Sequence, residues 1–137
     1  MGALFSQSFN PETDVGDLKG KVILITGGKY VGFSRGLLDS LTLNSSGIGF
    51  ATIRHLARLG AKVYMGARNK DEALEAIQRL KHEGLGPGYG EVVWLEVNLS
   101  DPRRSKKAAE EFMARESKLD VLGELFGSLL SGSPFVD

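Results

Sequence analysis

Cysteine is absent from this chain of 137 residues, which excludes disulfide bonds, thiolate zinc sites and a cysteine nucleophile. The chain also lacks an excess of basic residues, because 17 Lys and Arg residues balance 17 Asp and Glu residues. A protein that neutralises phosphates along a nucleic acid needs such an excess. We therefore expect that neither nucleic acid nor a metal ion is a partner of this chain.

Long apolar runs are missing as well. No stretch approaches the roughly 20 apolar residues that span a bilayer. The N-terminus lacks the charged start and long apolar stretch of a secretory signal, so the cytosol is the expected location. The first residues match the loose pattern for N-myristoylation, with Gly2 as the acceptor and Ser6 in the hydroxyl position, but chance produces this pattern more often than a lipid anchor does.

The residues that are present alternate between strand and helix patterns. With 42% hydrophobic and 25% charged residues, the chain fits one soluble globular domain. Apolar runs predict strands at 21–26, 62–67, 91–97 and 119–122, and helical spacing predicts helices at about 47–59, 70–83 and 101–117. This alternation predicts an α/β fold with a Rossmann-like, doubly wound parallel sheet and helices on both faces. Right-handed crossovers then give the strand order 3-2-1-4.

Helical spacing also predicts which side chains of the later two helices face the core. The expected inward residues are Ala73, Leu74, Ile77 and Leu80 in one helix and Ala108, Phe112 and Met113 in the other. Asn69 and Asp71 are suited to cap the first of these helices, and either Ser100 or Asp101, together with Pro102, starts the second.

The first strand-to-helix turn contains glycines in two separate groups. Thr26, Gly27 and Gly28 end the strand, whereas Ser45, Ser46, Gly47, Ile48 and Gly49 open the helix. A pyrophosphate binds well at a helix N-terminus, because free backbone N–H groups and the helix dipole face its charge and glycine lets the backbone come close. A glycine triplet alone is a weak signal, and here residues 29–44 interrupt the turn.

Joined across this interruption, the two groups spell Thr-Gly-Gly-Ser-Ser-Gly-Ile-Gly, which resembles the Thr-Gly-x-x-x-Gly-Ile-Gly motif of the classical short-chain dehydrogenases/reductases. The resemblance continues in order through segments 17–21, 50–60, 65–69, 98–101 and 118–122. Segment 65–69 is similar to the retinol-dehydrogenase-like branch of that family.

The resemblance implies a division of the chain into three parts. Residues 1–16 form an N-terminal lead-in, and residues 17–122 form a partial Rossmann NAD(P)-binding domain, truncated after its fourth strand and carrying an insertion at 29–44. Residues 123–137 form a tail outside the family pattern.

The same resemblance implies the residues of the phosphate loop. Gly27, Gly47 and Gly49 correspond to the loop glycines, and Ile48 belongs to the same motif. Ser46 either touches a phosphate or only caps the helix, and both alternatives stay open.

Arg68, Asn98 and Leu99 are the residues expected to select the cofactor and hold its adenine. NAD-specific relatives place an acid at the end of the second strand, whereas this chain has Ala67 followed by Arg68, which suits a 2′-phosphate. We therefore expect NADP rather than NAD. Asn98 stands where many relatives have Asp and would accept from the adenine amine, while Leu99 would offer its backbone.

The catalytic residues of the family are missing. Its Tyr, the Lys three places later and the preceding Ser have no counterparts, and Gly123, Glu124, Leu125 and Phe126 stand where Asn-Asn-Ala-Gly is expected. The resemblance thus implies an NADP-dependent oxidoreductase of apolar alcohols or carbonyl compounds, represented here by an inactive chain. We also expect the insertion to weaken or abolish dinucleotide binding.

Two alternatives remain open. The chain is either a non-catalytic nucleotide-binding or interaction module, which would dock or oligomerise through an exposed sheet edge, or a non-functional translation of retained introns. Codon choices at Lys29, Tyr30 and Val31 can supply a splice donor and Ser45 an acceptor, so transcript sequencing tests the second alternative.

Overall fold

Four parallel strands form one sheet in the order β3-β2-β1-β4, which confirms the predicted fold class and strand order. The computed structural model describes residues 8–26 and 47–124. The elements are α1 (Pro11–Asp14), β1 (Val22–Thr26), α2 (Gly47–Arg58), β2 (Lys62–Ala67), α3 (Lys70–Glu83), β3 (Glu91–Glu96), α4 (Pro102–Arg115) and β4 (Val121–Glu124). In these two ranges no helix is both long and apolar enough to cross a membrane.

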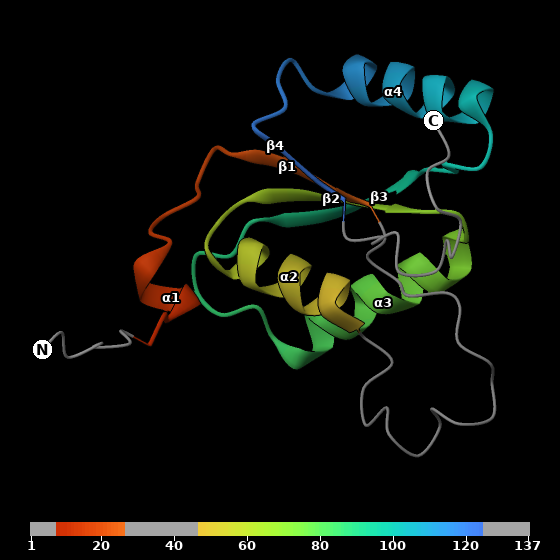
Figure 1. Cartoon of the computed structure of the whole chain (residues 1–137). Helices are drawn as coiled ribbons and strands as arrows, with labels where there is room; N and C mark the ends of the chain where they lie inside the picture. The colour runs from red at the N-terminus through yellow and green to blue at the C-terminus, as the bar shows by residue number, and fades with distance from the viewer. Residues whose placement is uncertain (1–7, 27–46, 125–137) are drawn as a thin grey trace, which may run out of the picture.

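Helices cover both faces of the sheet, α2 and α3 on one side and α4 on the other (Figure 1). The larger apolar cluster lies under α2 and α3 and includes Ile23, Ile53 and Val63. The smaller cluster lies under α4, where the rings of Tyr64 and Phe112 meet edge to face with centroids 5.0 Å apart. Burial on both faces explains why β1 and β2 have continuous apolar runs rather than alternating ones.

Of the capping residues that the sequence offers, Asn69 starts α3 and Asp101 starts α4. The Asn69 side chain accepts a hydrogen bond from the backbone N–H of Glu72 at 3.3 Å. The Asp101 side chain accepts from the N–H of Arg103 at 2.9 Å, and Pro102 takes the first helical position, where no N–H is needed. Both caps satisfy N–H groups that have no partner within the helix.

Two of the expected inward side chains are instead exposed. Leu74 is 40% exposed and Met113 is 67% exposed, so both predictions are wrong. The buried stripe of α3 is Ala73, Ile77 and Leu80 and that of α4 is Ala108 and Phe112. Each misassigned residue follows a buried one directly, which turns its side chain by about 100° around the helix.

The fourth strand lies two residues later than predicted, at Val121–Glu124 rather than 119–122. Before it, the Asp120 carboxylate accepts from the backbone N–H of Val22 at 2.8 Å, and the Asp120 N–H donates to the Val22 carbonyl at 2.9 Å. Regular pairing with β1 begins at Val121 and runs to Glu124, opposite Thr26. Tertiary pairing with β1, rather than local propensity, therefore sets these bounds.

A polar cluster of Lys62, Tyr64 and Glu116 links β2 to the C-terminal end of α4. Glu116 accepts from the Tyr64 hydroxyl at 2.7 Å and contacts the Lys62 ammonium at 2.5 Å. The hydrogen bond from Lys62, followed by that from Tyr64, lowers the pKa of Glu116. Burial is the main cause that raises the pKa of Tyr64, and the bond to Glu116 raises the pKa of Lys62. Glu116 is therefore held as a carboxylate between two donors.

Replacing Phe112 should test the packing under α4. We expect Phe112→Ala to lower the free energy of unfolding by about 3–5 kcal/mol, because it leaves a cavity beside Tyr64. Met113→Ala, at the exposed neighbouring position, should change it by less than about 0.5 kcal/mol. Urea denaturation followed by circular dichroism measures both variants. Equal losses would contradict the helix orientation described above.

Replacing Glu116 should make stability less sensitive to acid. Its folded-state pKa is lowered, so its contribution is present above the ordinary glutamate pKa of about 4.3 and is lost as the pH falls through the folded value. We expect Glu116→Gln to cost about 1 kcal/mol at pH 7 and progressively less below pH 4. Denaturation at several pH values measures this, with Glu110→Gln on the exposed face of α4 as the control. A constant difference at every pH would contradict the role of the charge.

Candidate functional site

The carboxyl ends of the four parallel strands lie at one edge of the sheet. The direction in which successive strands are added to the sheet reverses beside β1. From β1 the chain proceeds to β2 and β3 on one side, whereas β4 returns to the other side of β1. The connecting helices accordingly lie on opposite faces, and α2 begins at Gly47 beyond the end of β1 (Figure 1). In open α/β sheets, ligands bind outside the carboxyl ends of the strands at such a switch point.

Thr26 ends β1 at the centre of this edge. Its side chain is 4% exposed, and its hydroxyl oxygen has no hydrogen-bond partner among the residues that the structure describes. The neighbouring residue on β2 is Gly66, where an added Cβ would lie 3.2 Å from Thr26 Cγ2 and 3.1 Å from Val97 Cγ2. A buried hydroxyl without a partner is unfavourable, so a polar ligand atom at this edge would be stabilised by it.

The phosphate-loop residues are only partly within the described ranges. Gly27 and Ser46 lie outside them. Gly47, Ile48 and Gly49 form the start of α2, as the motif requires, and Gly49 is buried. No acidic residue occupies the first turn of α2, so its free N–H groups and dipole are not neutralised there.

Arg68 follows the last residue of β2 and is exposed. Within residues 8–26 and 47–124, no hydrogen bond or ion pair engages its guanidinium. The carbonyl of Ala67 accepts from Trp94 Nε1 at 3.1 Å and from the N–H of Val97 at 3.2 Å, which fixes the backbone that carries Arg68. Trp94 therefore anchors the backbone of the residue before Arg68, a contact that its sequence context does not reveal.

Asn98 and Leu99 follow β3 at the same edge. The side-chain oxygen of Asn98 accepts from the N–H of Ser100 at 3.0 Å and from its hydroxyl at 2.5 Å. Its carbonyl accepts from the Ser105 hydroxyl at 3.1 Å. Asn98 thus shapes the turn into α4, while Leu99 is 54% exposed beside it. The expected contact of the Asn98 side-chain oxygen with the adenine amine stays a prediction. This contact would compete with the two hydrogen bonds that the oxygen accepts from Ser100.

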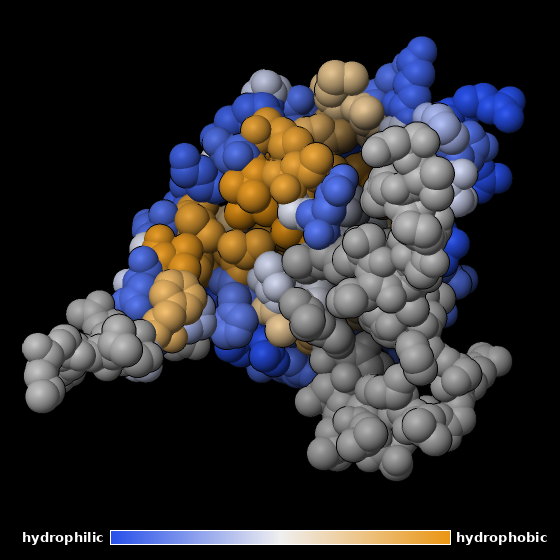
Figure 2. Space-filling view, viewed as in Figure 1, coloured by the Kyte–Doolittle hydropathy of each residue, from blue (hydrophilic) through white to orange (hydrophobic). Residues whose placement is uncertain are grey.

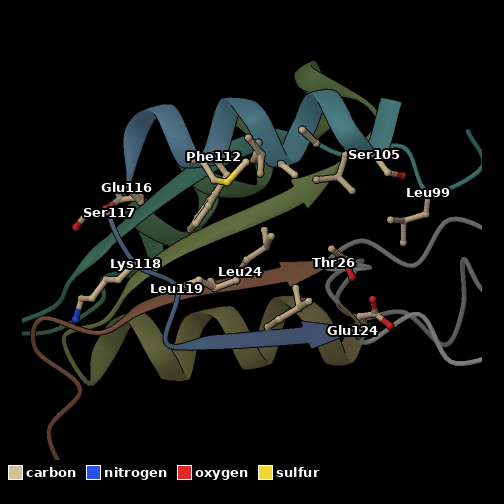
Figure 3. A pocket seen from close by; sticks show the side chains of 16 residues that line it. Leu24, Thr26, Leu99, Ser105, Phe112, Glu116, Ser117, Lys118, Leu119 and Glu124 are labelled. Carbon is tan, nitrogen blue, oxygen red and sulfur yellow. The ribbon is translucent and has the colours of Figure 1, made fainter. Parts of the chain in front are cut away.

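An apolar groove, which the sequence alone does not reveal, runs between α4 and strands β1 and β4 (Figure 3). It encloses about 490 Å³, and Thr26, Leu99, Ser105 and Glu124 lie at its carboxyl-edge end. Met113, Leu119 and Leu122 line it and are exposed, and Figure 2 shows the apolar area that extends over this side of the molecule. β4 is an edge strand of the described sheet, where we expect a contact with a partner or second copy.

The groups whose pKa values are displaced lie away from this edge. Lys62, Glu116 and Asp120 are at the amino ends of the strands, and the Tyr64 hydroxyl points to Glu116. The described residues include no group of His, Asp or Glu side chains that would hold a metal ion. The carboxyl edge therefore offers binding features, namely Thr26, Arg68 and the start of α2, and these fit an anionic dinucleotide.

Comparison with known sequences identifies the family. The family model described as short chain dehydrogenase matches residues 41–128. A short-chain dehydrogenase/reductase of Armillaria gallica is 40% identical over 117 residues, which cover 85% of this chain and 31% of the relative. One of Colletotrichum higginsianum is 36% identical over 110 residues, 80% of this chain and 23% of the relative. The chain thus spans about a third or less of the length of these relatives.

Solved structures agree on the fold. A short-chain type dehydrogenase/reductase from Mycobacterium ulcerans has a TM-score of 0.60 at 23% identity, with 80% of this chain and 33% of that chain covered. L-sorbose reductase from Gluconobacter frateurii, complexed with NADPH and L-sorbose, has a TM-score of 0.56 at 25% identity, with 77% and 33% covered. With this sheet, this edge and these relatives, the chain belongs to the short-chain dehydrogenase family.

Proposed function

We propose that this chain is the dinucleotide-binding part of an NADP-dependent short-chain dehydrogenase/reductase. The observation that carries the proposal is the position of Arg68, an exposed cation that follows β2 beside the switch point. A doubly wound sheet places the adenosine ribose at the end of its second strand, where a cation favours the 2′-phosphate of NADP. The NADPH complex of the similar L-sorbose reductase supports this choice.

Several other residues at this edge also have binding roles in this proposal. The start of α2 at Gly47 and Gly49 would direct its N–H groups toward the pyrophosphate, together with Gly27 and Ser46. Thr26 would donate its buried hydroxyl to a polar atom beside that pyrophosphate. The Leu99 backbone would lie next to the adenine.

The bound cofactor would supply or accept the hydride, and the chain's own residues would bind and orient it. We assign no catalytic residue in this chain, because it has no counterpart of the family's Ser, Tyr and Lys. Oxidation or reduction of an apolar alcohol or carbonyl compound is accordingly a proposal for the whole protein, which would need these residues from outside residues 1–137. The chain by itself would bind the cofactor without turning over a substrate.

The interrupted glycine turn would weaken that binding. Residues 27–46 separate β1 from α2, whereas such connections usually have about 2–6 residues. The family match begins at residue 41, near the end of the proposed insertion 29–44. Phosphate binding needs backbone donors held within about half an ångström of their productive positions. We therefore propose that the full chain binds dinucleotide in the millimolar range.

Replacing Arg68 should separate NADPH from NADH. We expect Arg68→Ala to weaken NADPH binding about tenfold, because a charge-assisted bond to the 2′-phosphate is lost, and to leave NADH binding unchanged. Titration followed by NMR measures both dissociation constants in the full chain. Arg115→Ala is the matched control, since Arg115 pairs with Glu111 at the far end of α4. Equal losses for the two cofactors would contradict a 2′-phosphate site.

Deleting residues 29–44 should restore the phosphate loop. The deletion joins Gly28 to Ser45, and we expect NADPH to bind at least tenfold more tightly, since the loop amides would then be held at fixed positions. The control is a chain without residues 1–7, whose affinity should equal that of the full chain. Thermal unfolding of each variant checks that it folds. Micromolar NADPH affinity in the undeleted chain would show that the insertion does not weaken the site.

A further inference from the structure

We infer that Glu124 makes the dinucleotide site favour the oxidised, positively charged nicotinamide over the reduced one. This inference rests on the proposed function and assigns a specificity role to a residue that the motif does not include. It follows from the place of Glu124 at the switch point, from the charge of Arg68 across the same edge, and from the charge difference between the two cofactor forms.

Glu124 ends β4 directly beside Thr26. The two residues are register partners in the parallel ladder, and neighbouring strands lie about 4.8 Å apart. Both side chains line the same end of the apolar groove, where Figure 3 shows them next to each other. Glu124 is exposed, and within the described ranges no lysine or arginine forms an ion pair with its carboxylate. Its charge thus lies at the switch point, beside Thr26, without an ion-pair partner among residues 8–26 and 47–124.

Arg68 and Glu124 lie on opposite sides of Thr26. Gly66 of β2 pairs with Thr26 on one side, and Glu124 pairs with it on the other. Arg68 follows β2 two residues after Gly66. A dinucleotide that crosses the switch point with its 2′-phosphate near Arg68 has its adenosine half on the β2 side. Its nicotinamide half then extends toward β4 and Glu124.

The two redox forms differ in charge only at the nicotinamide ring. The oxidised ring carries one positive charge and the reduced ring is neutral, whereas both forms have the same phosphates. Repulsion between Glu124 and the phosphates is therefore common to both forms and cancels in the ratio of their dissociation constants. Attraction between the carboxylate and the oxidised ring remains, and one charge pair near a solvated surface changes that ratio by about threefold.

The test is the ratio of the dissociation constants of NADP+ and NADPH in the full chain and in Glu124→Gln. We expect the substitution to shift the ratio about threefold toward NADPH, and Glu124→Asp to keep most of the original preference. Glu96→Gln is the matched control, because Glu96 is also an exposed acid at the end of a strand but lies on β3, farthest from β4. It should leave the ratio unchanged. NMR titration with 2′,5′-ADP, which has no nicotinamide, checks the adenosine half separately.

The outcomes separate this inference from the proposed function. An unchanged ratio in Glu124→Gln, with both dinucleotides bound, overturns the role of Glu124 and leaves the proposed function standing. A shift toward NADP+ overturns it as well, because Glu124 would then oppose the oxidised ring. Failure of both dinucleotides and of 2′,5′-ADP to bind at millimolar concentration overturns the proposed function and this inference together. Equal shifts in Glu96→Gln and Glu124→Gln overturn the specific assignment to β4.

Discussion

The pairing of β1 with β2 on one side and β4 on the other is the interaction on which the rest of the structure depends. Because β1 lies between β2 and β4, Val22–Thr26 pair with β2 and residues 23–26 pair with β4, and helices cover both faces of the sheet. The reversal of strand order occurs beside β1, so the same pairing that stabilises the sheet also creates the edge at which a ligand can bind. β1 therefore contributes both to the stability of the sheet and to the candidate site.

The two ends of the sheet are built differently. At the amino ends, Asp120 accepts from the N–H of Val22 at 2.8 Å, Lys118 donates to the carbonyl of Gly20 at 2.6 Å, and Glu116 joins β2 to α4. At the carboxyl ends, the described residues present an unpartnered Thr26 hydroxyl and the unpaired charges of Arg68 and Glu124. Side chains of the protein therefore link the amino ends of the strands, whereas these three groups at the carboxyl ends have no polar partner within residues 8–26 and 47–124.

Local patterns in the sequence were sufficient for the strands, their order and the caps at Asn69 and Asp101, since each depends on short-range chemistry or on the handedness of crossovers. Periodicity alone could not predict the bounds of β4 or the exposure of Met113, because both depend on which segments pack beside these residues. At the site, Arg68 is exposed, and its role toward a cofactor stays a prediction. The sequence could not predict the hydrogen bond from Trp94 to the Ala67 carbonyl or the one from Ser100 to Asn98. No rule of residue spacing specifies that these atoms approach each other.

The opposite charges of Arg68 and Glu124 also affect how a ligand arrives. The chain has a formal net charge of zero at pH 7, and within it Arg68 and Glu124 are a cation and an anion on either side of Thr26. At distances beyond a Debye length, about 8 Å at physiological ionic strength, their fields largely cancel. An anionic dinucleotide therefore gains little steering during diffusion, and its association rate should be nearly independent of salt. In the proposed complex the two charges would act only at short range, where they would influence how the two ends of the dinucleotide are oriented.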